Sequence, residues 1–190
     1  MSELIYAALG LLGLDTGLMI LIFCNFNIIK TKEGSNLPKG QASWFLWVAG
    51  MAEVIAAAFF FGVGDTLDAA TFAGFGLFWM GLGTISFWAG DGRVLGPMAI
   101  AYAIFAAALT PAYMCTSWTL GLLLLFLVFI FLALIPSAWD KANAKLLGTL
   151  QLITFLIAMV AIFGLVWASL PETGLTAQLN GIGVKLLLLR

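Results

Sequence analysis

The chain has 190 residues, of which 63% are hydrophobic and 9% are charged, with a formal net charge of −1 and a mean hydropathy of +1.12. A soluble domain carries about 25% charged residues, so this composition excludes an ordinary soluble protein and favours a protein solvated by a lipid bilayer. No basic run is present to neutralise phosphates, which argues against a nucleic-acid partner. Histidine is missing, and with it the usual metal ligand and neutral-pH proton carrier, so we expect no metal site and no cofactor.

Apolar runs alternate along the chain with short polar, proline-containing or glycine-containing breaks. A membrane-spanning helix needs about 20 mostly apolar residues. Six runs meet this condition, at residues 4–29, 43–62, 69–89, 95–115, 118–138 and 145–169. The sequence therefore predicts an all-α polytopic membrane protein, with a bundle of six transmembrane helices in one domain at 1–170 and a short tail at 171–190.

Basic residues gather in the connections that follow the first, third and fifth predicted spans. Six of the eight basic residues lie there: Lys30, Lys32, Lys39, Arg93, Lys141 and Lys145. Because cytoplasmic loops are enriched in Lys and Arg, this bias places these connections in the cytoplasm and both termini outside. We expect a multi-pass protein of the inner or plasma membrane.

Two acidic residues lie inside predicted spans. Asp15 is in the first span with glycines around it, and Glu53 is in the second, between Ala52 and Val54. A charge at the bilayer centre costs about 2.5–3.5 kcal/mol on insertion scales, so each carboxyl group needs a partner, a proton or water. We consider both as candidates for the path of a solute or a proton. The alternative is a protonated side chain that hydrogen-bonds a neighbouring helix.

The third span begins with GDTLDAATFAGFGLFW, residues 64–79. Its two aspartates can cap the helix or lie at the mouth of a pore. Phe72, Phe75 and Trp79 recur at helical spacing, and the glycines beside them let helix backbones approach closely in lipid. This grouping indicates either tight helix packing or a pore lined with aromatic rings.

Polar groups in the sixth span are Gln151 and Thr154, which in lipid more often form interhelical hydrogen bonds than bind a ligand. We keep both, together with Trp79, as candidates for the solute path. Without histidine, no Ser-His-Asp or Cys-His set can be assembled, so we expect no catalytic residue and no enzyme.

The segment at 64–79 resembles the signature of the acetate uptake transporter family, also called the succinate–acetate permeases, which runs roughly G-N-T-F-G and then F-x-S-Y-G-x-F-W. The positions in the same register are Gly64, Asp65, Thr66, Phe72, Gly74, Phe75, Gly76, Phe78 and Trp79. The resemblance continues in VAGMAEVIAAAFF of the second span and, less specifically, in LGPMAIAYAIFA and LLLLFLVFIFLAL of the fourth and fifth.

This resemblance implies a homo-hexamer in which each subunit has its own pore through a six-helix bundle. It implies acetate or another short monocarboxylate as the solute. It also implies a narrow apolar ring that closes the pore, which falls on Leu14, Phe75 and Leu127 of this sequence. Such a ring suits a gate, because a tight apolar constriction loses water and blocks ions.

The sequence also departs from the family. The hallmark Asn-Pro-Ala-Pro-Leu-Gly-Leu of the first span survives only as AALGL, and Glu53 stands at the position of a family Gln. The resemblance implies an N-terminus inside the cell, whereas the charge bias places it outside. A second resemblance, to the six-helix urea and short-amide channels, fits outside termini and a basic first loop. A structural membrane subunit of a larger complex is a third interpretation, and it predicts no water path past Glu53.

Overall fold

Helices account for the regular structure of the computed structural model, which describes residues 2–29, 37–171 and 175–187. Within these ranges no β-strand occurs, and six helices are long and apolar enough to cross a membrane. The candidate spans are Glu3–Asn25, Lys39–Val63, Thr66–Phe87, Gly92–Thr116, Trp118–Trp139 and Ala144–Ala168. The predicted fold class, a multi-pass all-α membrane protein, is confirmed. The first span ends at Asn25 rather than at residue 29.

The spans differ in how many helical segments they contain. The first, third and sixth are single helices: α1 (Ser2–Asn25), α4 (Thr66–Phe87) and α7 (Ala144–Ala168). The other three spans are composite. The second contains α2 (Leu37–Ser43), the π-helical η1 (Trp44–Gly50) and α3 (Met51–Val63). The fourth contains the 3-10 turn η2 (Gly92–Val94) and α5 (Leu95–Thr116), and the fifth contains α6 (Trp118–Leu134) and the 3-10 turn η3 (Ile135–Trp139). A further helix, α8 (Leu175–Leu187), follows the sixth span.

Short polar segments end one helix and start the next. Gly64 ends α3 with a φ of 85°, a left-handed conformation that favours glycine. Asp65 then caps α4, since its side chain accepts a hydrogen bond from the backbone N–H of Asp68 at 3.1 Å. Asn143 caps α7 in the same way. Of the two aspartates in the GDTLD segment, Asp65 is therefore the cap, and the Asp68 carboxylate is available for another role.

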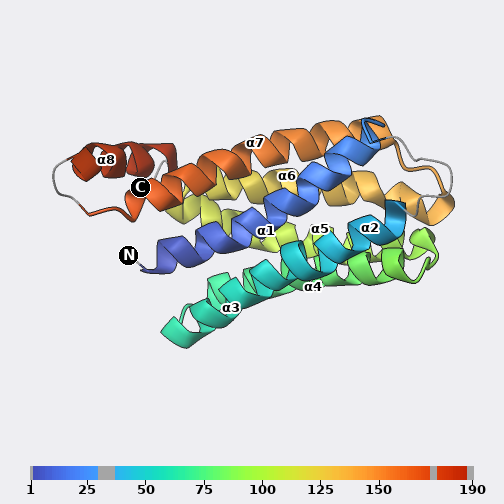
Figure 1. The fold of residues 1–190 in the computed structure, drawn as a ribbon, viewed down its shortest axis with the longest axis horizontal. Helices are drawn as coiled ribbons and strands as arrows, with labels where there is room; N and C mark the ends of the chain where they lie inside the picture. The colour runs from blue at the N-terminus through green and yellow to red at the C-terminus, as the bar shows by residue number, and fades with distance from the viewer. Residues whose placement is uncertain (1, 30–36, 172–174, 188–190) are drawn as a thin grey trace.

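The six spans lie lengthwise alongside one another (Figure 1), and the contacts between neighbouring spans close into a ring. Helix α1 packs between α3 and α7, α7 packs on α6, α6 on α5, and α3 on α4. Aromatic side chains join α4 to α5: the Tyr102 hydroxyl donates a hydrogen bond to the Gly74 carbonyl at 3.1 Å, and the rings of Phe75 and Phe105 lie 5.4 Å apart. The ring of helices thus encloses the side chains described below.

Close backbone approach explains part of the glycine grouping in the third span. A Cβ on Gly76 would lie 3.0 Å from the Gly50 carbonyl oxygen, and a Cβ on Gly50 would lie 3.0 Å from that of Gly76. Both distances are shorter than ordinary Cβ contacts, so these helices cross at a point where only glycine fits on either side.

The C-terminal segment differs from the tail expected from the sequence, because residues 175–187 form a helix docked beside α7 (Figure 1). Asn180 donates hydrogen bonds to the carbonyls of Ala168 and Leu170. The hydroxyl of Ser117, at the start of α6, donates to the Leu187 carbonyl at 2.6 Å. These bonds hold α8 at the end of the bundle where α6 begins.

The connections after α1, α4 and α6 lie at the end of the bundle opposite α8 (Figure 1), and they contain several charged residues. The Arg93 side chain bonds both carboxylate oxygens of Asp91 and holds the pKa of that exposed carboxyl at about 2. Lys39, Lys141 and Lys145 lie in or beside the same connections. Lys30 and Lys32, on which the orientation prediction also rests, lie outside the described residues, as does part of the predicted tail.

Candidate functional site

Two cavities lie inside the ring of helices. Cavity 1, toward the N-terminal ends of α1, α4 and α6, has a volume of about 40 Å³. It is lined by Ala7, Leu11, Leu14, Glu53, Asp68, Thr71, Phe72, Phe75, Tyr113, Leu120, Leu123, Leu124 and Leu127. Because one water needs about 10–15 Å³ of such volume, cavity 1 has room for about three waters or one very small solute.

Cavity 2, toward the C-terminal ends of the same helices, has a volume of about 130 Å³. It is lined by Leu14, Leu18, Leu21, Asn25, Phe75, Phe78, Trp79, Leu82, Leu95, Leu127, Ile130, Phe131, Leu134, Leu147 and Gln151. The two cavities therefore follow one another along the axis of the bundle.

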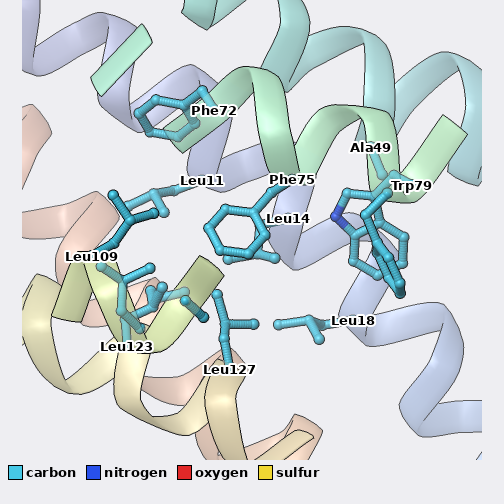
Figure 2. Packing of buried hydrophobic residues seen from close by; sticks show 14 of the residues in the cluster. Leu11, Leu14, Leu18, Ala49, Phe72, Phe75, Trp79, Leu109, Leu123 and Leu127 are labelled. Carbon is cyan, nitrogen blue, oxygen red and sulfur yellow. The ribbon is translucent and has the colours of Figure 1, made fainter. Parts of the chain in front are cut away.

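Leu14, Phe75 and Leu127 line both cavities, and no other described residue does. Figure 2 shows the ring of Phe75 next to Leu14 with Leu127 beneath, while Phe72, Leu11 and Leu123 lie on one side of this group and Leu18 and Trp79 on the other. All three side chains are buried. The structure thus brings together three residues, from α1, α4 and α6, that the family resemblance assigns to a constriction.

Neighbouring aromatic rings fix the position of Phe75. Its ring lies parallel to that of Phe131 with centroids 6.2 Å apart, and it also contacts Phe105 and Tyr102. Phe78, one turn further along α4, packs edge-on against Phe131 and Tyr102. The aromatic grouping of the third span therefore both packs α4 against α5 and α6 and supplies one wall of the cavities.

Glu53 lines cavity 1 from α3 and is 1% exposed. Its carboxyl group has a hydrogen bond with the side chain of Trp79, whose indole N–H is the donor, and its Oε2 atom has no partner among the described residues. Trp79 itself lines cavity 2 and stacks on Phe45. Because Glu53 lines cavity 1 and Trp79 lines cavity 2, this polar contact joins the walls of the two cavities.

A second polar group in cavity 1 consists of Asp68, Thr71 and Tyr113. The Tyr113 hydroxyl donates a hydrogen bond to the Asp68 carboxylate, and the Thr71 hydroxyl donates to the carbonyl of Leu67 at 2.8 Å. Thr71 and Tyr113 were not among the residues predicted from the sequence. The signal available was the unused aspartate of GDTLD, but its partner is 45 positions away and on another helix.

An amide pair lines cavity 2. The side chain of Asn25 in α1 donates a hydrogen bond to Gln151 Oε1 in α7 at 2.7 Å. Gln151 is buried, as is expected for a polar side chain with an interhelical partner. Asn25 also lines an open pocket with Lys145 beyond cavity 2, toward the end of the bundle that carries the described cations of the connections.

Two residues selected from the sequence lie elsewhere. Asp15 lines neither cavity but an open groove of about 590 Å³ on the outer face, between α1, α2, η1 and α7. It is 3% exposed, and neither carboxylate oxygen has a hydrogen-bond partner in the described part of the chain. Thr154 is buried and donates to the Leu150 carbonyl of its own helix, and it lines neither cavity. The described residues contain no cluster of three or more metal-ligating side chains.

Comparison with known proteins reveals a similarity of fold. A solved structure of the bacterial acetate channel SatP superposes on this chain with a TM-score of 0.74 at 20% sequence identity, covering 87% of this chain and 97% of that one. No protein-family model and no curated protein sequence matches the chain. The resemblance inferred from the sequence is therefore confirmed for the fold, while the resemblance to urea and short-amide channels stays a prediction.

Proposed function

We propose that this chain is a channel of the inner or plasma membrane that passes small solutes, foremost acetate or another short monocarboxylate, through a pore within each subunit. The observation that carries the proposal is the pair of cavities that meet at Leu14, Phe75 and Leu127. The similarity of fold to an acetate channel supports the same solute class. A purely structural subunit predicts no space beside Glu53, whereas Glu53 lines cavity 1.

The three apolar side chains are the proposed gate. An apolar constriction of this kind excludes water and so blocks ions and bulk solvent, while a small, weakly hydrated solute passes when the side chains move apart. Cavity 1 and cavity 2 are the waiting positions on either side. The proposal includes a homo-hexamer, which the family resemblance implies. Large apolar side chains on the outside, such as Trp47, Phe61 and Ile104, suit contact with lipid or with neighbouring subunits.

Flux through liposomes containing the purified protein tests the proposal. Labelled acetate and labelled urea are compared at equal concentration, with empty liposomes as the background. A background variant has Cys24 and Cys115 replaced by alanine. In this background, Leu127→Cys is treated with a small neutral thiol reagent. Val128→Cys receives the same treatment as the matched control, because Val128 lines neither cavity.

We expect acetate flux above background that the reagent abolishes in Leu127→Cys and leaves unchanged in Val128→Cys. A flux that is equally insensitive in both variants would show that the solute does not pass the constriction. Absence of any flux above that of empty liposomes would reject the channel.

A further inference from the structure

Cavity 1 is unusual in its hydrogen-bonding capacity. Its polar side chains, in the described part of the chain, are Glu53, Asp68, Thr71 and Tyr113. The single hydroxyl hydrogens of Tyr113 and Thr71 are already donated, to Asp68 and to the Leu67 carbonyl. What remains on these lining residues are acceptor positions: hydroxyl lone pairs and carboxyl oxygens, including the buried, unpartnered Oε2 of Glu53.

Positive charge is missing from the same walls. No lysine or arginine lines cavity 1 or cavity 2 among the residues that the structure describes. Lys145 lines only the open pocket beyond cavity 2. An anion entering from that end therefore meets a cation at the mouth but finds none at the constriction, and two carboxyl groups lie on the far side.

The energetics disfavour an anion in this position. A buried charge is tolerated when it is paired or receives several hydrogen bonds, and cavity 1 provides neither a cation nor a free hydroxyl donor. A protonated Glu53 would add one O–H donor but no positive charge. An uncharged solute that carries its own N–H or O–H group, in contrast, satisfies the unpartnered Oε2 of Glu53.

We infer that cavity 1 is a binding site for an uncharged hydrogen-bond donor, a short primary amide or the undissociated form of a short carboxylic acid, with Glu53 as the principal acceptor. This inference rests on the proposed function and specifies the form in which the solute reaches the constriction. Asp68, oriented by Tyr113, and the Thr71 oxygen are the further acceptors. The side-chain amides of Asn25 and Gln151 in cavity 2 contain both hydrogen-bond donors and acceptors, so cavity 2 suits a primary amide and an undissociated acid alike.

Liposomes containing the wild-type protein distinguish the solute forms. Uptake of labelled acetamide, acetate and methylammonium is measured at membrane potentials of either sign, with empty liposomes as the background. We expect acetamide uptake above background, and acetate uptake that acidifies the lumen and does not change with the sign of the potential. Acetone, which has the shape of acetamide but no donor, should fail to compete with labelled acetamide.

Two outcomes would overturn the inference. One is acetate uptake without acidification that follows the potential, since 100 mV changes the equilibrium accumulation of a monovalent anion about 50-fold. The other is potential-driven uptake of methylammonium in place of acetamide. Both leave the proposed channel intact. Absence of flux for all three solutes would instead reject the proposed function itself.

Matched variants locate the site. Glu53→Leu removes the acceptor, and we expect acetamide uptake to fall about tenfold or more, in line with the cost of leaving a polar group unpaired. Glu53→Gln keeps a carbonyl acceptor and should lose less. Asp15→Leu removes the other unpartnered buried carboxyl group, which lines the outer groove, and should leave uptake unchanged. Equal uptake by Glu53→Leu and Asp15→Leu, with both proteins assembled, would show that Glu53 is not the acceptor.

Discussion

Glu53 and Asp15 show how two buried carboxyl groups in one bundle differ in their surroundings. Glu53 has the Trp79 side chain as a partner and lies at an internal cavity. Asp15 has no hydrogen-bond partner among the described residues and lies at a groove on the outer face. A buried polar group without a partner costs about 1–3 kcal/mol, so the two side chains should respond differently to replacement.

Replacing Asp15 by leucine should stabilise the isolated protein. The change removes an unpaired carboxyl group from an apolar environment of Leu12, Met19 and Ile20 and adds apolar contact. We expect a higher midpoint of thermal unfolding in detergent, with Asp15→Asn in between. A lower midpoint for Asp15→Leu would show that the carboxyl group has a partner in the assembled protein, such as a neighbouring subunit.

At the scale of helices, close glycine contacts decide which elements pack tightly. The contact of Gly50 with Gly76 lets the second span cross α4, and the contact of Gly164 with Gly183 lets α8 lie against α7. A Cβ on Gly183 would lie 2.7 Å from the Gly164 carbonyl oxygen and 2.8 Å from the carbonyl carbon of Trp167. Backbone atoms cannot move aside as a flexible side chain can, so Gly183 is essential for this docking.

Substitution of Gly183 by leucine should therefore detach α8 from the bundle. Gly181 on the same helix is the control, because a Cβ there would meet nothing within 4 Å, and the gain in helix propensity is the same at both sites. Hydrogen–deuterium exchange over residues 175–187 should become faster in Gly183→Leu and not in Gly181→Leu. Equal exchange in both variants would mean that the hydrogen bonds of Ser117 and Asn180 hold α8 without the close contact.

At the scale of the whole molecule, the ring of six spans encloses an axis on which polar and apolar zones alternate. Cavity 1 has the acidic and hydroxyl side chains, the three residues shared by both cavities are apolar, and cavity 2 has the Asn25–Gln151 pair. The described cations of the connections lie beyond cavity 2, and the positive-inside rule predicts that this end faces the cytoplasm.

Some of this arrangement was predictable from the sequence. The spans follow from hydropathy, because each is a long apolar run. Glu53 could be selected as a candidate site residue because a charged side chain inside a membrane is energetically unfavourable. The face on which a side chain lies does not follow: Leu14 and Asp15 are neighbours in the chain, about 100° apart around α1, and only Leu14 lines the cavities. The pairing of Asp68 with Tyr113 joins helices whose order in the bundle no local pattern reveals.

If solute passes between Leu14, Phe75 and Leu127, replacing Phe75 by alanine should change both the rate and the selectivity of uptake. Phe60→Ala is the matched control, because Phe60 is also buried, stacks on Phe72, and lines neither cavity. Because Phe→Ala costs about 3–5 kcal/mol in soluble cores, both variants are first checked for assembly by size-exclusion chromatography.

Uptake of acetate and of the larger succinate is then measured in liposomes that hold equal amounts of assembled protein. We expect Phe75→Ala to raise acetate uptake and to weaken the discrimination against succinate, since the proposed constriction loses its largest side chain. Phe60→Ala should keep the ratio of the wild-type protein. If Phe75→Ala assembles normally and leaves both rates and their ratio unchanged, the three side chains only pack the bundle and the solute path lies elsewhere.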